Sequence, residues 1–394
     1  MKFKIPFSGR SHFYLDSEIS EVIKVMNSAI PLTQGKHLKD FENNLAEYFK
    51  FKNVFAVNSA TSALELCAQL CQFSDDDEVI IPSHTYTSSA YPFIKSGAKI
   101  IWADINQETR TVDVDTIKKC ISQKTKAVVV VHLYGYAINM EPIIDLCKEK
   151  NILIIEDVAQ AIGTSINGKM AGTFGDYGVL SFHSHKNITT LGEGGALFVK
   201  DDKIADVIPL LRHNGHCQFS FDRKEYWKPA MGNVDLPEIN GKKLMPNNFC
   251  IGEVECALGS KLLDRLNKIN DLKRERAIYF IDSLKNYEEL IFHRVDSNQH
   301  NYHLLAAESK GGIRDEFFKI MSNEEGIQCA VQYIPLNRYD LYKKLGYGFA
   351  NCPNADKFFD HMISFPFHHL LKDEEIDIIL KATKKTIEKI VSQK

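Results

Sequence analysis

The sequence predicts an α/β protein with a mostly parallel sheet, followed by a smaller α+β domain. Three observations support this: short runs rich in Val and Ile, helical patterns of roughly 10–15 residues between them, and a change in the pattern of apolar residues near residue 250. Such alternation produces βαβ units whose helices cover both faces of a sheet. Ligands bind these sheets beyond the carboxyl ends of the strands, so functional residues are expected there.

The predicted elements of the first part follow one another in order. Apolar, β-branched runs predict strands, and apolar residues three or four apart predict helices. The expected strands are 55–57, 78–81, 99–103, 127–131, 152–155, 178–182 and 195–199. The expected helices are 62–73, 88–96, 113–121 and 140–150.

The pattern changes after residue 250. Residues 251–286 are predicted to be one long helical stretch, because leucines recur at helical spacing, and a shorter αβ region follows it. We therefore expect a large domain at 15–250 and a smaller one at 251–394, with residues 1–14 packing near the smaller one. The segment 216–246 lacks periodicity and is expected to be a long functional loop. Its aromatic residues are Phe219, Phe221, Tyr226 and Trp227.

The composition narrows the class of protein. The chain has 394 residues, with 48 Lys and Arg against 51 Asp and Glu. A formal charge of −3 gives no electrostatic basis for nucleic acid as the main partner, although a local anion site would suffice for a phosphorylated small molecule. The apolar run at 127–134 is far shorter than the roughly 20 residues that span a bilayer, so no membrane partner is expected.

Cysteine usage and the N-terminus indicate a cytoplasmic location. The first residues contain no apolar run of secretory length, and none of the nine cysteines forms a CxxC pair. Reduced thiols are therefore expected. Cys67 and Cys71 lie four apart in a helical pattern and are expected to be small buried apolar residues. No metal is expected, because the His183 and His185 pair lacks further ligands.

Two polar residues follow predicted strands. The apolar run at 152–155 leads to an acid, Asp157, a position at which an Asp often only caps a helix. Lys186 lies five residues past Ser181 and precedes a glycine-rich turn. Taken alone, it would be a solvated loop lysine, and the glycines would be turn formers.

Thr61 and Ser62 stand where a small, polar loop opens a helix. Alone, they indicate an ordinary N-cap, but backbone N–H groups at a helix start together with hydroxyls also form an anion site. With Asp157 and Lys186 they suit pyridoxal phosphate, which needs an imine-forming lysine, an acid that keeps its ring nitrogen protonated, and a phosphate cradle. The lysine must be neutral to react, so burial is expected to lower its pKa.

Short motifs along the whole chain carry a family resemblance. They are Thr33-Gln-Gly35, Pro82-Ser-His-Thr-Tyr86, Val131-His-Leu-Tyr-Gly135, Gly172-Thr-Phe-Gly-Asp176, Arg212-His-Asn-Gly215, Tyr333-Ile-Pro-Leu336 and Ser364-Phe-Pro366. With the features above, the sequence resembles the DegT/DnrJ/EryC1/StrS family of sugar aminotransferases. The resemblance implies the fold type I (aspartate aminotransferase-like) architecture, with a mostly parallel seven-stranded sheet between helices and a smaller C-terminal α+β domain.

The resemblance also implies residue roles. Lys186 corresponds to the family's Schiff-base lysine, which moves the proton during transamination, and Asp157 to the acid paired with the ring nitrogen. Tyr86 corresponds to an aromatic residue stacked on the cofactor ring, and Gln160 to a residue near the cofactor hydroxyl. The phosphate ligands that the resemblance implies are Thr61, Ser62 and Ser181.

One implied residue acts across a subunit boundary. Asn248 corresponds to an asparagine that reaches the phosphate of the neighbouring subunit, although Asn247 leaves the assignment open by one position. This correspondence implies a homodimer with shared active sites. The family pattern that follows is often an aromatic residue and then arginine, whereas this chain has Phe249 and Cys250.

Substrate residues are expected at the smaller domain and beside the lysine. They are His183, Gln332, Tyr333 and Asn337. The family often has histidine where this chain has Gln332 and Asn337. These departures bear on which sugar is bound and leave the chemistry unaffected.

The resemblance implies amino transfer from L-glutamate to a nucleotide-linked keto-deoxy sugar by a ping-pong mechanism, through an internal aldimine on Lys186. Similarity to 4-aminotransferases at Ser181-Phe-His and Asn187-Ile-Thr-Thr favours a 4-keto-6-deoxyhexose. The spacing from Lys186 to Glu193 leaves a 3-keto sugar open. The implied destination is a surface polysaccharide, such as the O-antigen of lipopolysaccharide, or another glycoconjugate.

Other activities compete with this interpretation. A sugar dehydratase or an aminocyclitol aminotransferase of the same family stays open, although dehydratases replace the lysine with histidine and Lys186 aligns at the lysine position beside His185. A non-catalytic regulatory protein on this fold would not need an imine-forming lysine. A nicotinamide-dependent enzyme is disfavoured, because the glycines at 192–195 lack the GxGxxG spacing after a first strand.

Overall fold

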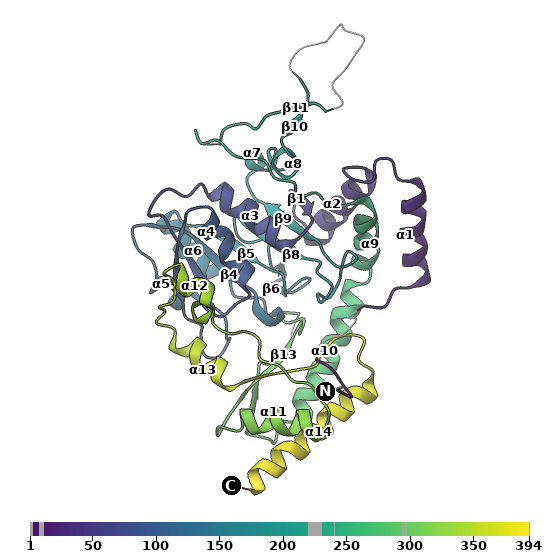
Figure 1. Cartoon of the computed structure of the whole chain (residues 1–394), viewed down its shortest axis with the longest axis vertical. Helices are drawn as coiled ribbons and strands as arrows, with labels where there is room; N and C mark the ends of the chain where they lie inside the picture. The colour runs from purple at the N-terminus through teal and green to yellow at the C-terminus, as the bar shows by residue number, and fades with distance from the viewer. Residues whose placement is uncertain are drawn as a thin grey trace.

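The computed structural model describes residues 3–7, 12–219, 231–239, 241–293, 295 and 298–393. Within these ranges, a large part built around a sheet stands next to a smaller part that contains α11 (Arg314–Asn323) and α14 (Asp373–Ser392) (Figure 1). Of the aromatic residues predicted for the long loop, Phe221, Tyr226 and Trp227 lie outside the described residues. In the described ranges, no helix is both long and apolar enough to cross a membrane.

A seven-stranded sheet forms the centre of the large part. Its strands are β1 (Val54–Val57), β2 (Glu78–Pro82), β3 (Lys99–Ala103), β4 (Thr125–Val131), β5 (Leu153–Asp157), β8 (Tyr177–Ser181) and β9 (Gly195–Val199). The order is β1-β9-β8-β5-β4-β2-β3, and β9 is antiparallel to both neighbours while the other adjacent pairs are parallel. The predicted mostly parallel seven-stranded sheet is confirmed, with each strand within about two residues of its predicted bounds.

Helices cover both faces of this sheet, as the composition of its strands requires. Alternate side chains of β4 point to opposite faces, so Val129 packs in one core with Leu66, and Val128 packs in another with Ile143. The helices of the large part are α1 (Asp16–Ser28), α2 (Lys36–Phe49), α3 (Ala60–Cys71), α4 (Tyr91–Lys95), α5 (Val114–Lys118), α6 (Glu141–Lys150), α7 (Asp202–Ala205) and α8 (Ile208–Arg212). Cys67 and Cys71 lie on α3 and are buried in the core against which this helix packs, as predicted.

Short elements complete the connections. The predicted helix at 88–96 is instead a 3-10 turn, Thr87–Ser89, followed by α4, because Ala90 between them departs from helical angles. Two small two-stranded antiparallel sheets pair β6 (Ser165–Ile166) with β7 (Lys169–Met170) and β10 (His216–Cys217) with β11 (Asn233–Val234).

The smaller part packs helices on a three-stranded antiparallel sheet. The strands are β12 (Leu290–Phe292), β13 (Leu305–Ser309) and β14 (Met362–Phe365). Phe280, Phe317 and Phe365 are fully buried in its core. Near the N-terminus, Ile5 joins this core and forms a bridge with Ile327. Two further short helices are α12 (Asp340–Lys344) and α13 (Pro353–His361).

Two helices replace the single stretch predicted at 251–286. They are α9 (Glu253–Leu263) and α10 (Leu266–Ser283), separated where Arg265 departs from helical angles (φ −112°, ψ 9°). α9 packs against α1 and α2 of the large part (Figure 1). α10 begins in that core with Leu266 and Ile269 and ends in the smaller core with Phe280. The domain division at residue 250 stays a prediction.

Candidate active site

One cavity of about 450 Å³ lies beyond the carboxyl ends of the central strands. It gathers most of the predicted site residues from segments far apart in the chain. From the large part it is lined by Thr61, Tyr86, Asp157, Gln160, Ser181, His183 and Lys186, and from the smaller part by His303, Gln332, Tyr333 and His368, among others.

Lys186 reaches this cavity from the loop that follows β8. Its backbone is held at both ends, because Lys186 N–H donates to the carbonyl of His183 at 2.8 Å and His12 Nε2 donates to the Lys186 carbonyl at 2.7 Å. Burial lowers the pKa of Lys186 to about 8, although Asp157 and Glu193 act in the opposite direction. Near neutral pH the amine therefore has a larger neutral fraction than an exposed lysine, as a nucleophile requires.

Asp157 stands at the end of β5 and is almost fully buried. Its Oδ2 accepts from Ser89 Oγ at 2.7 Å, and its Oδ1 accepts from the Ala159 backbone N–H at 3.0 Å. These two donors fix the orientation of the carboxylate against the cavity wall. An acid held in this way suits a basic ring nitrogen placed within the cavity.

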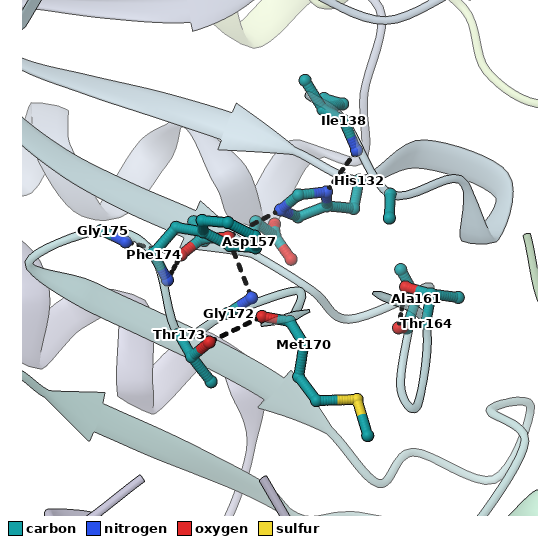
Figure 2. A network of polar contacts seen from close by, with 12 residues as sticks. His132, Ile138, Asp157, Ala161, Thr164, Met170, Gly172, Thr173, Phe174 and Gly175 are labelled. Atoms are coloured by element: carbon teal, nitrogen blue, oxygen red, sulfur yellow. Dashed lines mark hydrogen bonds and ion pairs between the residues drawn. The ribbon is translucent and has the colours of Figure 1, made fainter. Parts of the chain in front are cut away.

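The residue before Asp157, Glu156, is fully buried, and its hydrogen-bond partners His132, Gly172, Phe174 and Gly175 are labelled in Figure 2. Its carboxylate accepts from the backbone N–H groups of Gly172 at 2.9 Å, Phe174 at 2.7 Å and Gly175 at 2.7 Å. His132 Nε2 donates the fourth bond at 3.0 Å, because its Nδ1 already accepts from Ile138 N–H. A buried carboxylate needs this many donors. The motif at 172–176 therefore supplies backbone N–H groups that bind the Glu156 carboxylate.

The start of α3 forms the opposite end of the cavity. Ser59 caps the helix by accepting from the Ser62 N–H at 3.0 Å, and Ala60 and Thr61 line the cavity. Helix geometry leaves the first N–H groups without intrahelical partners, which favours an anion there. A Cβ at Gly195 would lie 2.5 Å from backbone atoms of Ser59 and Ala60, so glycine is what lets β9 approach this turn.

An aromatic and amide cluster forms a third wall. The Tyr86 ring is 55% exposed and meets the Tyr333 ring edge-on, with centroids 5.9 Å apart. Gln160 accepts from Tyr134 N–H at 2.9 Å and donates to the Tyr333 hydroxyl at 3.1 Å. Burial raises the pKa of Tyr333, so its hydroxyl stays protonated. Tyr86 thus offers a free ring face beside a fixed polar cluster.

Three predicted site residues do not line this cavity. Ser62 is buried behind Thr61, where its hydroxyl donates to Asn58 Oδ1 at 2.6 Å. Asn337 is buried and donates to the Gly348 carbonyl at 3.4 Å. Asn248 forms a bridge with His213 away from the cavity of its own chain.

Several contributors were missed from sequence. Ser89 and Tyr134 hold Asp157 and Gln160, and His12 and His303 come from segments more than a hundred residues from Lys186. Only topology brings them to the site, so no local pattern points to them. Glu156 did carry a signal, because an acid inside an apolar strand must be paired.

The donor set fits pyridoxal phosphate. A lysine with a lowered pKa, an oriented carboxylate and a helix N-terminus with hydroxyls all border one cavity, and Tyr86 adds an exposed ring face. Lys186 would hold the cofactor aldehyde, Asp157 its ring nitrogen and the start of α3 its phosphate.

Comparisons with known proteins agree with this chemistry. GDP-perosamine synthase of Vibrio cholerae is 31% identical over 355 residues, covering 89% of this chain and 91% of that protein. Helicobacter pylori PseC, an aminotransferase of pseudoaminic acid biosynthesis, is 28% identical with a TM-score of 0.86, covering 99% of this chain and 100% of that one. The PMP form of the putative sugar aminotransferase Spr1654 of Streptococcus pneumoniae is 26% identical with a TM-score of 0.85, covering 97% and 99%.

A family model matches residues 14–384, which is nearly the whole chain. The fold is that of fold type I transferases, and the cofactor is pyridoxal phosphate. The protein is thus a sugar aminotransferase, and it belongs to the DegT/DnrJ/EryC1/StrS aminotransferase family.

Proposed function

We propose that the enzyme transfers an amino group from L-glutamate to a nucleotide-linked 4-keto-6-deoxyhexose in a ping-pong reaction. One observation carries the catalytic part: Lys186 and Asp157 border the same cavity as the N-terminus of α3. The sugar position rests on the sequence similarity to 4-aminotransferases, and the donor rests on the family resemblance. The relative that makes GDP-perosamine supports a nucleotide sugar as the acceptor.

The residues of the chain would have two roles, which are holding the cofactor and transferring the proton. When bound, pyridoxal phosphate supplies an electron sink for the carbon that loses its proton. Asp157, oriented by Ser89, would keep the ring nitrogen protonated. Lys186, once free of the cofactor, would take the proton from the amino acid carbon in the first half-reaction and would deliver a proton to the sugar carbon in the second. Its lowered pKa permits both directions near neutral pH.

The substrate side of the cavity is rich in imidazoles and in neutral polar groups. His183, Gln332 and Tyr333, which we propose to contact the substrate, border the cavity, and His303 adds a buried imidazole. Burial keeps the pKa of His303 well below its ordinary value, so it offers a neutral hydrogen-bonding group. Neutral donors and acceptors suit sugar hydroxyls, which carry no charge.

We propose that the enzyme acts as a homodimer in the cytoplasm. An apolar face of α1 supports the dimer, since Ile19, Ile23 and Met26 are 45%, 53% and 63% exposed at helical spacing. Ile30, two residues after the end of α1, is 96% exposed as well. An apolar patch of this kind favours a protein partner. Asn248, which does not line its own cavity, is proposed to reach the partner's phosphate.

The test is a panel of nucleotide-linked 3-keto and 4-keto sugars incubated with the enzyme and glutamate. Mass spectrometry of the product is expected to find an amino group on the 4-keto sugar. Amination of the 3-keto sugars alone would contradict the proposed position. The product is proposed to enter a surface polysaccharide, such as an O-antigen, or another glycoconjugate.

A second experiment separates transamination from dehydration. Glutamate added to the holoenzyme is expected to abolish the absorbance band of the lysine-bound cofactor and to release 2-oxoglutarate. A band that glutamate leaves unmoved would contradict the choice of donor. If other amino donors also leave it unmoved, transamination itself fails.

A further inference from the structure

Lys273 is a buried cation that the reaction above does not use. It lies on α10 with a relative exposure of 4%. Its Nζ donates to Asn187 Oδ1 at 3.3 Å and to the His303 carbonyl at 3.0 Å, and it stands 5.5 Å from the Phe367 ring centroid. Among the described residues, no carboxylate lies within ion-pair distance. Burial lowers its pKa to about 7.

The stability of the fold does not explain a lysine here. An ammonium group taken from water without a counter-ion is costly, and an apolar side chain of similar size is often tolerated as well or better at such sites. A residue that is expensive for folding and yet held by two specific contacts points to a role in the site.

Those contacts lead to both walls of the active cavity. Asn187 directly follows Lys186, and its Nδ2 donates to Asn270 Oδ1 at 2.7 Å, one helical turn before Lys273. Asn270 in turn donates to the Ile162 carbonyl at 2.9 Å, which joins this network to the large part. On the other side, His303 lines the cavity from the smaller part.

We propose that Lys273 is a positioning residue that acts through Asn187 to hold Lys186 in place. Through its bond to the His303 carbonyl, it also fixes the part of the cavity wall that His303 forms. This inference rests on the proposed role of Lys186. The geometry supports it because a loop residue next to a nucleophile transmits any displacement directly to it. A shift of about 1 Å at a reacting group can cost ~10²-fold in rate.

The test compares Lys273→Met with Lys268→Met, an exposed lysine on the same helix. Apoprotein is mixed with pyridoxal phosphate, and the absorbance band of the lysine-bound cofactor is followed in time. Borohydride reduction and peptide mass spectrometry then locate the adduct on Lys186. We expect Lys273→Met to form the adduct ~10- to 100-fold more slowly, with a melting temperature no lower than wild type, and Lys268→Met to match wild type.

Asn187→Leu, which keeps Lys273, tests whether Lys273 acts on Lys186 through Asn187. It is expected to slow adduct formation similarly, and the double variant is expected to be no slower than the slower single variant, because both changes remove the same Lys273–Asn187 hydrogen bond. If Lys273→Met does not fold, Asn187→Leu alone decides the question. A rate within about 2-fold of wild type in Asn187→Leu, or additive losses, would overturn the inference. If wild type forms no adduct on Lys186, the proposed function fails instead.

Discussion

At the scale of single residues, Lys186 decides whether the chain is an enzyme of this kind. Lys186→Ala is expected to lower turnover by ~10³-fold or more, because both the imine-forming amine and the proton carrier are lost. The glutamate-dependent release of 2-oxoglutarate measures this loss of turnover. Lys200→Ala, at an exposed lysine outside the cavity, should behave as wild type. Unchanged turnover in Lys186→Ala would refute the assigned role.

The pH dependence of cofactor capture follows from the pKa of Lys186. The neutral amine attacks the aldehyde, so capture is expected to accelerate as pH rises and to level off above about 8, not above the ordinary 10.5. Stopped-flow absorbance of apoprotein with pyridoxal phosphate measures the profile.

A matched variant checks the cause of that pKa. Asp157 raises the pKa of Lys186, so Asp157→Asn is expected to move the midpoint to lower pH. Asp145→Asn, at an exposed acid on α6, should leave the midpoint unchanged. A profile that climbs to pH 10 in the wild type would show that burial does not act on Lys186 as described.

How far the sequence predicts the site depends on how local its chemistry is. Asp157 stands at a strand end, Thr61 at a helix start and Lys186 in the loop after a strand. The pattern of apolar runs reveals these places, and all three residues line the cavity. Ser89 and His303 could not be inferred, because their positions depend on how distant segments pack. The fold brings these two residues to the site, and no spacing of residues along the sequence indicates it.

At the scale of elements, the junction of β9 with α3 shapes the anion end of the cavity. Gly195→Ala places a Cβ 2.5 Å from backbone atoms of Ser59 and Ala60, so the start of α3 must move. We expect a loss of about 1–3 kcal/mol in stability and weaker binding of pyridoxal phosphate. Chemical denaturation and fluorescence titration measure the two effects.

Pyridoxal, which lacks the phosphate, is the control ligand for that variant. Its binding to Gly195→Ala should change less than that of pyridoxal phosphate, because the displaced N–H groups at Ala60 and Thr61 would hold the phosphate, which pyridoxal lacks. Equal losses for both ligands would indicate general damage to the fold instead.

Element boundaries show where sequence patterns reach their limit. The strands are well predicted, because a buried parallel strand is a short apolar run with clear ends. The break between α9 and α10 was missed, because no Gly or Pro marks Asp264 or Arg265 and the apolar spacing continues across them. Packing of α9 on α2, which a single sequence does not reveal, accompanies the break between the two helices.

At the scale of the whole molecule, the exposed face of α1 makes the assembly testable. Light scattering is expected to give twice the chain mass of 44.8 kDa for wild type. Met26→Asp should shift the enzyme toward monomers, because a carboxylate would be buried in the interface. Val391→Asp, at an exposed apolar residue of α14, should stay dimeric. A monomeric wild type would contradict the dimer.

The course of α10 ties the two cores together thermodynamically. Leu266 and Ile269 belong to one core and Phe280 and Ile281 to the other, along a single helix of 18 residues. Helix formation is cooperative, so melting one core strips half of α10 of its partners and weakens the other half. We therefore expect the two cores to unfold together rather than one before the other.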